Sequence, residues 1–116
     1  MLFTTLKVAD TEYKLRLNVR ALINLEKRLG KNPLDIFMKV KDSELPKLED
    51  MMIVFHESLQ AYQHGKTLDD AYDIYDKYIE DGGTYTDFIP VVMDIYKVSG
   101  LFKEEKTAKG KTAKNA

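Results

Sequence analysis

Residues 13–38 change their hydrophobic period part-way along, and this change constrains the fold more than any other feature of the sequence. Tyr13, Leu15 and Leu17 alternate with charged residues, the period of two that is typical of a half-buried strand. From Asn18 onward the apolar residues recur at helical spacing, and asparagine is a favourable residue for capping a helix. A strand that passes directly into a helix must share one core with it. The other elements are therefore expected to pack on this unit.

Local signals place the elements on either side of this unit. Gly30 stops the first helix, because glycine readily adopts the left-handed conformation that ends a helix. Asn32 and Pro33 then cap and begin a second, short helix. Upstream, residues 2–8 predict a strand and residues 9–11 a short turn, which makes the N-terminus a β-hairpin. Because a two-stranded hairpin is marginal alone, it should lie on helices or gain strands from another copy.

Three longer helices are predicted after these elements. Each carries apolar residues at helical spacing and is bounded by capping residues or glycines. They are expected at about 46–64 with Asp42 or Ser43 as cap, from Thr67 to the Gly82-Gly83 break, and at about 86–98. Leu101 and Phe102 should fold back over the final turn of the last helix. The predicted fold class is α+β, mostly α, with an N-terminal two-stranded β-hairpin packed on about five helices.

Composition limits the chain to one domain. Its 116 residues are 44% hydrophobic and 32% charged, which suits a globular domain with a single core. We expect residues 1–102 to form that domain. Residues 103–116 hold five Lys and two Glu, a net charge of +3, and predict a disordered, flexible Lys-rich tail. The other 13 basic and 17 acidic residues give the domain a net charge of −4, which argues against nucleic acid as a partner.

Several kinds of site and location are excluded or disfavoured. The absence of cysteine excludes disulfides, thiol catalysis and cysteine-ligated zinc. No apolar run reaches the roughly 18 to 20 residues that span a bilayer. The N-terminus lacks the charged and long apolar regions of a signal peptide. A cytoplasmic protein without a membrane partner is the simplest interpretation.

The search for catalytic and metal-binding motifs gives little. Residues 56–60, His-Glu-Ser-Leu-Gln, begin like a helical zinc motif, but Gln60 stands where the second histidine is required. Asp69, Asp73 and Asp76 share one helix face and could hold a divalent cation, although a solvated face is the preferred interpretation. We therefore expect no enzyme activity, no catalytic residue, no metal and no cofactor.

A cluster of basic residues is the second candidate site. Five side chains could gather along one side of the first helix: Arg16, Arg20, Lys27, Arg28 and Lys31. The aromatic residues that would stack on bases are not interleaved with them. A solvated helix face is preferred, and a small nucleic-acid-binding regulator is the weakest functional alternative.

The broad apolar faces of the third and fifth helices are the most informative feature for function. Methionine fills gaps in cores, but it also suits surfaces that accept varied apolar partners. We predict a partner-binding surface there, while the same side chains could instead belong to the core. Its expected members are Met51, Met52, Phe55, Val92 and Met93.

Over about residues 6–102 the chain resembles the tail assembly chaperones of long-tailed bacteriophages, prophages and gene transfer agents. The resemblance rests on four segments, of which the strand-to-helix run at 15–30 is the most specific. They are YKLRLNVRALINLEKRLGKNPLDIF, LQAYQHG at the end of the next helix, TLDDAYDIYDKYIEDGG, and a last helix ending in Ser-Gly-Leu-Phe.

The resemblance implies a non-enzymatic chaperone in the cytoplasm of an infected bacterium. Such a protein binds the long, helical, apolar tape measure protein, keeps it soluble and helps to recruit tail tube subunits. It is absent from the mature virion. In many members a ribosomal frameshift near the C-terminus gives a longer product whose extension contacts the tail tube protein.

One alternative to this function stays open beside the nucleic-acid regulator. The chain could be a phage or bacterial adaptor that binds one structured protein. Whatever its function, the chain could form a homo-oligomer, because a hairpin edge and a wide apolar face both favour self-association.

Overall fold

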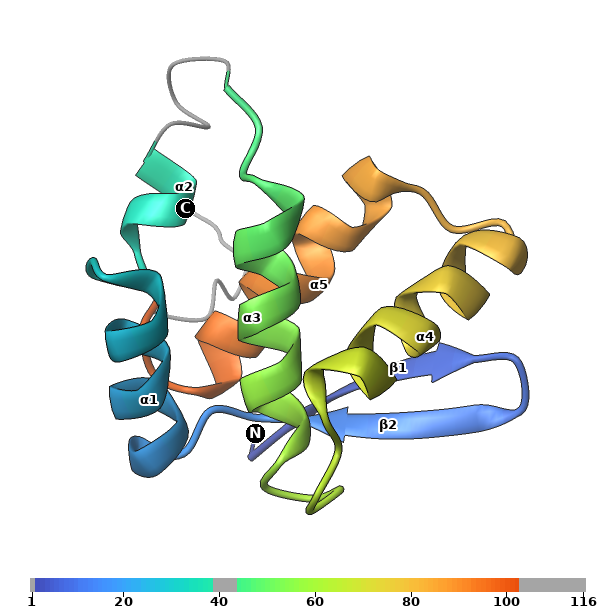
Figure 1. The fold of residues 1–116 in the computed structure, drawn as a ribbon, viewed down its shortest axis with the longest axis horizontal. Coiled ribbons are helices and arrows are strands. Elements are labelled where there is room, and N and C mark those ends of the chain that lie inside the picture. Colours follow the sequence, from blue (N-terminus) through green and yellow to red (C-terminus); the bar gives the residue numbers. More distant parts are fainter. Residues whose placement is uncertain (1, 39–43, 103–116) are drawn as a thin grey trace, which may run out of the picture.

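The structure, a computed structural model, describes residues 2–38 and 44–102. It contains a hairpin followed by five helices (Figure 1), so the predicted architecture is confirmed for this part of the chain. The elements are β1 (Thr4–Val8), β2 (Thr11–Leu15), α1 (Val19–Leu29), α2 (Asp35–Met38), α3 (Leu48–Leu59), α4 (Leu68–Glu80) and α5 (Tyr85–Val98). The predicted tail at 103–116 and the candidate caps Asp42 and Ser43 lie outside the described residues.

The hairpin has a tight turn of two residues. β1 pairs antiparallel with β2, and Val8 faces Thr11 in the last pair before the turn. Thr11, which the sequence placed in the turn, therefore belongs to the strand. Ala9 takes a left-handed φ of 54°, as the first central residue of such a turn requires. Its backbone N–H donates to Asp81 Oδ2 at 2.6 Å, and this bond ties the turn to the end of α4.

The inner face of the hairpin is covered by helices. Leu6, Val8 and Leu15 are buried in the core. On the β2 side, the side-chain amide of Gln63 bonds to the backbone of Lys14 in both directions. It accepts from the Lys14 N–H at 3.0 Å and donates to the Lys14 carbonyl at 2.8 Å. A glutamine side chain thus occupies, at this residue, the edge that a third strand would use.

The local signals that were predicted to bound the helices act as expected. Asn18 Oδ1 accepts from the backbone N–H of Ala21 at 3.0 Å and caps α1. Gly30 ends that helix with a φ of 69°. Thr67 and Asp70 form a capping box at the start of α4, and the hydrogen bonds from Thr67 lower the pKa of the Asp70 carboxyl.

The third helix is shorter than predicted. The periodicity indicated about 46–64, whereas α3 runs from Leu48 to Leu59. The side chain of Gln60 explains the early end, because it bonds to the chain that follows. Its amide nitrogen donates to the carbonyl of Lys66 at 2.7 Å, and its oxygen accepts from the N–H of Gly65. These bonds close a compact loop that directs α4 back along α3.

The core is built around α3, which contacts α1, α4, α5 and β2. Figure 1 shows α3 between α1 on one side and α4 on the other. The rings of Phe55 in α3 and Phe88 in α5 meet edge to face with centroids 5.4 Å apart. The fully buried hydrophobic side chains of α3 and α5 are Met51, Val54, Phe55, Leu59, Phe88, Val92, Ile95 and Tyr96.

The end of the described chain closes the core beside α2. The Tyr96 hydroxyl donates to the carbonyl of Pro33 at 2.8 Å in a buried site. Burial raises the pKa of this hydroxyl, so it keeps its proton. The backbone N–H of Leu101 donates to the Tyr96 carbonyl, and the ring of Phe102 packs against Phe37 and Tyr96. The predicted return of Leu101 and Phe102 over the last helical turn is confirmed.

Substitution of Tyr96 tests the bond between the last helix and the loop before α2. We expect Tyr96→Phe to lower the free energy of unfolding by about 1–2 kcal/mol, because the buried Pro33 carbonyl loses its donor. Unfolding by guanidinium chloride measures the change. Tyr62→Phe removes the same atom from a side chain that is 41% exposed. It should change stability by less than about 0.5 kcal/mol. Equal losses in the two variants would contradict the assigned role of the buried bond.

Candidate functional site

The predicted partner surface lies mostly in the core. Met51, Met52, Phe55 and Val92 are at most 3% exposed, whereas Met93 is 36% exposed. The alternative that the sequence left open is therefore the one that the structure supports for the first four. The physical reason is the central position of α3, whose wide apolar side is covered by the helices and the strand of its own chain.

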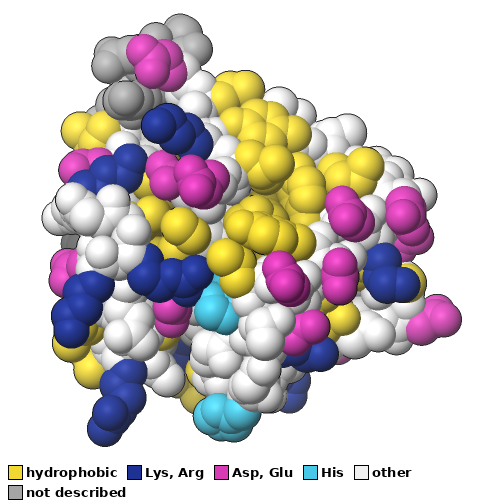
Figure 2. Space-filling model, viewed as in Figure 1, with side chains coloured by type: hydrophobic (Ala, Val, Ile, Leu, Met, Phe, Trp, Pro, Cys, Tyr) yellow, Lys and Arg dark blue, Asp and Glu magenta, His cyan; other side chains and the backbone are white. Residues whose placement is uncertain are grey.

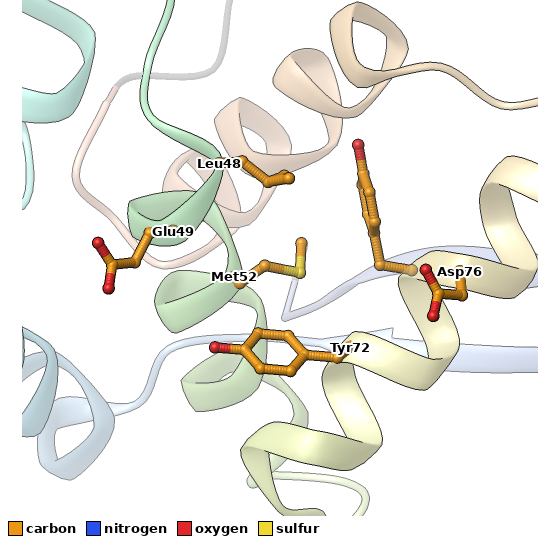
Figure 3. A pocket seen from close by; sticks show the side chains of 6 residues that line it. Leu48, Glu49, Met52, Tyr72 and Asp76 are labelled. Carbon is orange, nitrogen blue, oxygen red and sulfur yellow. The ribbon is translucent and has the colours of Figure 1, made fainter.

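An exposed apolar groove lies beside these buried residues, between α3 and α4. It has a volume of about 440 Å³, within the range of ligand-binding clefts. Each helix contributes residues one turn apart, so that one side of each helix forms a wall. The lining residues are Leu48, Glu49 and Met52 from α3, and Tyr72, Tyr75 and Asp76 from α4 (Figure 3). We call this site the α3–α4 groove.

Apolar side chains dominate the walls of the α3–α4 groove. Leu48 is 40% exposed and Tyr72 is 42% exposed, whereas Met52 is buried and contributes to the floor. Tyr75 packs edge to face on Phe88 with centroids 5.1 Å apart, and burial raises the pKa of its hydroxyl. Figure 2 shows a continuous apolar band over this part of the molecule. Apolar side chains that are exposed together, rather than singly, are typical of an interaction site.

The edges of the groove are acidic. Figure 3 shows Glu49 on the α3 side and Asp76 on the α4 side, with apolar side chains between them. The α4 helix adds further negative charge, because it holds five acidic residues and one basic residue, Lys77. The acidic residues of α4 are Asp69, Asp70, Asp73, Asp76 and Glu80.

Some of the basic residues singled out in the sequence bond to other parts of the fold. Arg16 donates to two backbone carbonyls, those of Leu2 and Val98. Two ion pairs connect the α1 region to α3. Arg28 lies 2.7 Å from Glu57, and Lys31 lies 3.2 Å from Asp50. Three of the five basic side chains therefore hold parts of this fold together.

The histidine and aspartate candidates also have structural surroundings. Nδ1 of His56 lies 2.7 Å from an Arg28 nitrogen, and Nε2 lies 2.9 Å from the carbonyl of Lys66. His56 thus connects α1, α3 and the loop before α4. Across residues 2–38 and 44–102, the structure brings together no three side chains that are suited to holding a metal ion. In the same ranges no helix is long and apolar enough to cross a membrane.

Comparison with known proteins gives one match. A family model described as a family of unknown function, DUF6096, matches residues 2–116. The chain belongs to this family. No curated protein and no solved structure matches it. The similarity of this DUF6096 chain to tail assembly chaperones therefore stays a prediction from its sequence pattern.

Of the residues that line the α3–α4 groove, the sequence predicts Met52 in the partner surface and Asp76 on a solvated helix face. The apolar spacing of α4 also predicts Tyr72, which lines the groove, and Ile79, which does not, on the inner side of that helix, but each is 42% exposed. Ile74 was not expected there, yet it is buried beside Ala71. The available signal was the width of the apolar side of α4 in this DUF6096 chain. It spans more positions than one buried face of a helix requires.

The ion pair between α1 and α3 gives a test of this part of the fold. We expect Arg28→Met to lower the free energy of unfolding by about 1–3 kcal/mol, because it leaves the buried Glu57 carboxylate without its cation. The lower half of that range is favoured because the Arg28 side chain is 28% exposed. Lys27→Met, at the exposed neighbouring position, is the matched control. Urea unfolding compares them, and an equal loss in both variants would contradict a specific role for the pair.

Proposed function

We propose that this DUF6096 chain is a non-enzymatic phage tail assembly chaperone that binds the tape measure protein and keeps it soluble. The observation that supports this function is the α3–α4 groove, an open apolar site with a helix on each side. Grooves of this kind receive the apolar face of an amphipathic helix in many complexes. The tape measure protein of such phages is expected, from the resemblance, to be long, helical and apolar.

The dimensions of the groove suit a short helical segment of a client. The residues that line it fall within 48–52 of α3 and 72–76 of α4, about 6 Å of rise on each helix at 1.5 Å per residue. A partner helix that lay on this groove would place about two apolar residues in it, one turn apart at positions i and i+3 or i+4. A long helical protein repeats such a segment many times, so several copies of the chain could cover it.

The chemistry of the groove favours binding over catalysis. Of the six described residues that line it, two are carboxylates, two are tyrosines and two are aliphatic. Glu49 and Asp76 stand at opposite edges rather than beside a nucleophile (Figure 3). The raised pKa of Tyr75 keeps its hydroxyl protonated near neutral pH, so it is a poor base.

The remaining parts of the proposal follow from the same function. The chain acts in the cytoplasm of the host bacterium, helps to recruit tail tube protein around the tape measure, and is absent from the mature virion. A longer, frameshifted product would place its extension after residues 103–116 and contact the tube protein there. Reading the nucleotides that encode this segment tests the frameshift independently of the chaperone.

Co-expression tests the proposed function. The partner is the longest reading frame downstream of this gene, the presumed tape measure protein. We expect that protein to be soluble only when it is produced with this chain, and to co-purify with several copies of it. If its solubility is unchanged and nothing co-purifies, the tape measure is not the partner. A stable one-to-one complex with a different, structured protein would favour the adaptor alternative.

Groove variants connect that result to the site. Leu48→Gln and Tyr72→Gln change exposed side chains, so the fold should be retained within about 0.5 kcal/mol. We expect each to lower the soluble yield and the recovery of the tape measure protein. Ile23→Gln, at an α1 position that is 48% exposed, is the matched control and should behave like the original chain. Met51 and Met52 are unsuitable for this test because both are buried.

A further inference from the structure

We propose that the α3–α4 groove selects amphipathic helices whose apolar stripe is flanked by Lys or Arg. The inference rests on the proposed function only in taking the groove as the client-binding site. It adds the chemistry of the client segment, which neither the family match nor the resemblance supplies. The inference rests on charge complementarity between a bound helix and the edges of the groove.

Within residues 2–38 and 44–102, one carboxylate at the α3 edge of the groove, that of Glu49, forms no ion pair. Two other acidic residues of α3 are engaged inside the fold, Asp50 with Lys31 and Glu57 with Arg28. Glu49 is exposed and is one of the residues that line the groove, and its carboxylate extends from α3 on the side away from α4 (Figure 3). A cation on a bound helix would therefore meet Glu49 without displacing an ion pair of these α3 residues.

The α4 edge presents a row of carboxylates along the groove. Asp69, Asp73, Asp76 and Glu80 are all exposed and recur every three or four residues, so they follow one side of the helix. Asp76 lines the groove itself. Figure 2 shows acidic side chains along one border of the apolar band. The fifth acidic residue of α4 serves the capping box instead.

The two edges together define what a bound helix must carry. Its apolar residues would contact Leu48, Met52 and Tyr72, while the positions on either side of that stripe would face carboxylates. Lys or Arg at those positions is attracted, and Glu or Asp is repelled. Rim charges of this kind favour the right partner and reject wrong ones more than they add affinity.

Two synthetic helical peptides test this selectivity on the purified chain. They share one apolar stripe and differ only in their flanking residues, Lys in one and Glu in the other. At about 0.05 M salt we expect the Lys peptide to bind roughly three- to tenfold more tightly, the effect of two or more exposed charge pairs. At about 1 M salt the difference should largely disappear, because the Debye length falls to about 3 Å. Equal affinities at low salt would overturn the proposal, as would no binding of either peptide.

Charge reversal locates the effect. The double variant Glu49→Lys/Asp76→Lys should reverse the preference, so that the Glu peptide binds more tightly. The matched control is Glu12→Lys/Glu26→Lys, which makes the same change in net charge at exposed positions on β2 and α1. It should keep the preference for the Lys peptide. If both double variants lose the preference equally, the selectivity reflects overall charge and the groove does not provide it.

The experiments separate this inference from the proposed function. A groove that prefers the Lys peptide in a chain that fails to solubilise the tape measure protein supports the inference and removes the function. If solubilisation depends on the groove but neither peptide is preferred, the function is supported and the inference is removed. A second copy of this chain is the other candidate to occupy the groove. Its α1 helix exposes the apolar residues Val19 and Ile23 beside the basic residue Arg20. If light scattering shows self-association that both Ile23→Gln and Leu48→Gln abolish, the groove holds a second copy and the proposal fails.

Discussion

The burial of α3 is the constraint on which the rest of the structure depends. Its twelve residues contact two other long helices, the helix after the hairpin and a strand, so its apolar side is almost wholly covered. In its first turn, Leu48 stays 40% exposed. Figure 1 shows α4 slanting away from α3 from the end at which the two are joined. Because the helices diverge, the tyrosines of α4 reach only part of the gap, and the α3–α4 groove is what is left open.

Polar side chains connect these helices to one another and to the hairpin. Gln60 closes the loop between α3 and α4, and Gln63 attaches the same loop to the backbone of Lys14. Arg28 connects α1 to Glu57 on the opposite side of α3. A glutamine amide can donate and accept at once, so Gln63 pairs both backbone groups of Lys14 at the sheet edge, and Gln60 bonds to the backbone of Gly65 and Lys66 in the loop. The apolar residues supply the core, while these three polar residues connect the elements around it.

This division explains which parts of the structure the sequence predicts. The caps at Asn18, Gly30 and Thr67 depend on neighbours within a few residues, and the pattern identifies them correctly. The end of α3 depends on a loop that folds back through Gln60, which periodicity cannot detect. The binding site is even harder to predict from the sequence. An apolar helix face has the same pattern whether its own chain or a partner covers it, so Met51 and Leu48 look alike in sequence although only Leu48 is exposed.

The small size of the groove bears on how the chain would act. Specific one-to-one complexes bury roughly 1,200–2,000 Å² in total, which exceeds what two exposed anchors, Leu48 and Tyr72, and a short acidic edge can supply. A single copy should therefore hold a helix weakly. Weak sites can still be effective when many copies act on one long client. The client aggregates through its uncovered segments, and each bound copy covers one of them. Repeated occupancy also allows each copy to leave when a tighter partner arrives. A shallow, acidic-edged groove thus suits a protein that coats a client transiently better than one that holds a single structured partner.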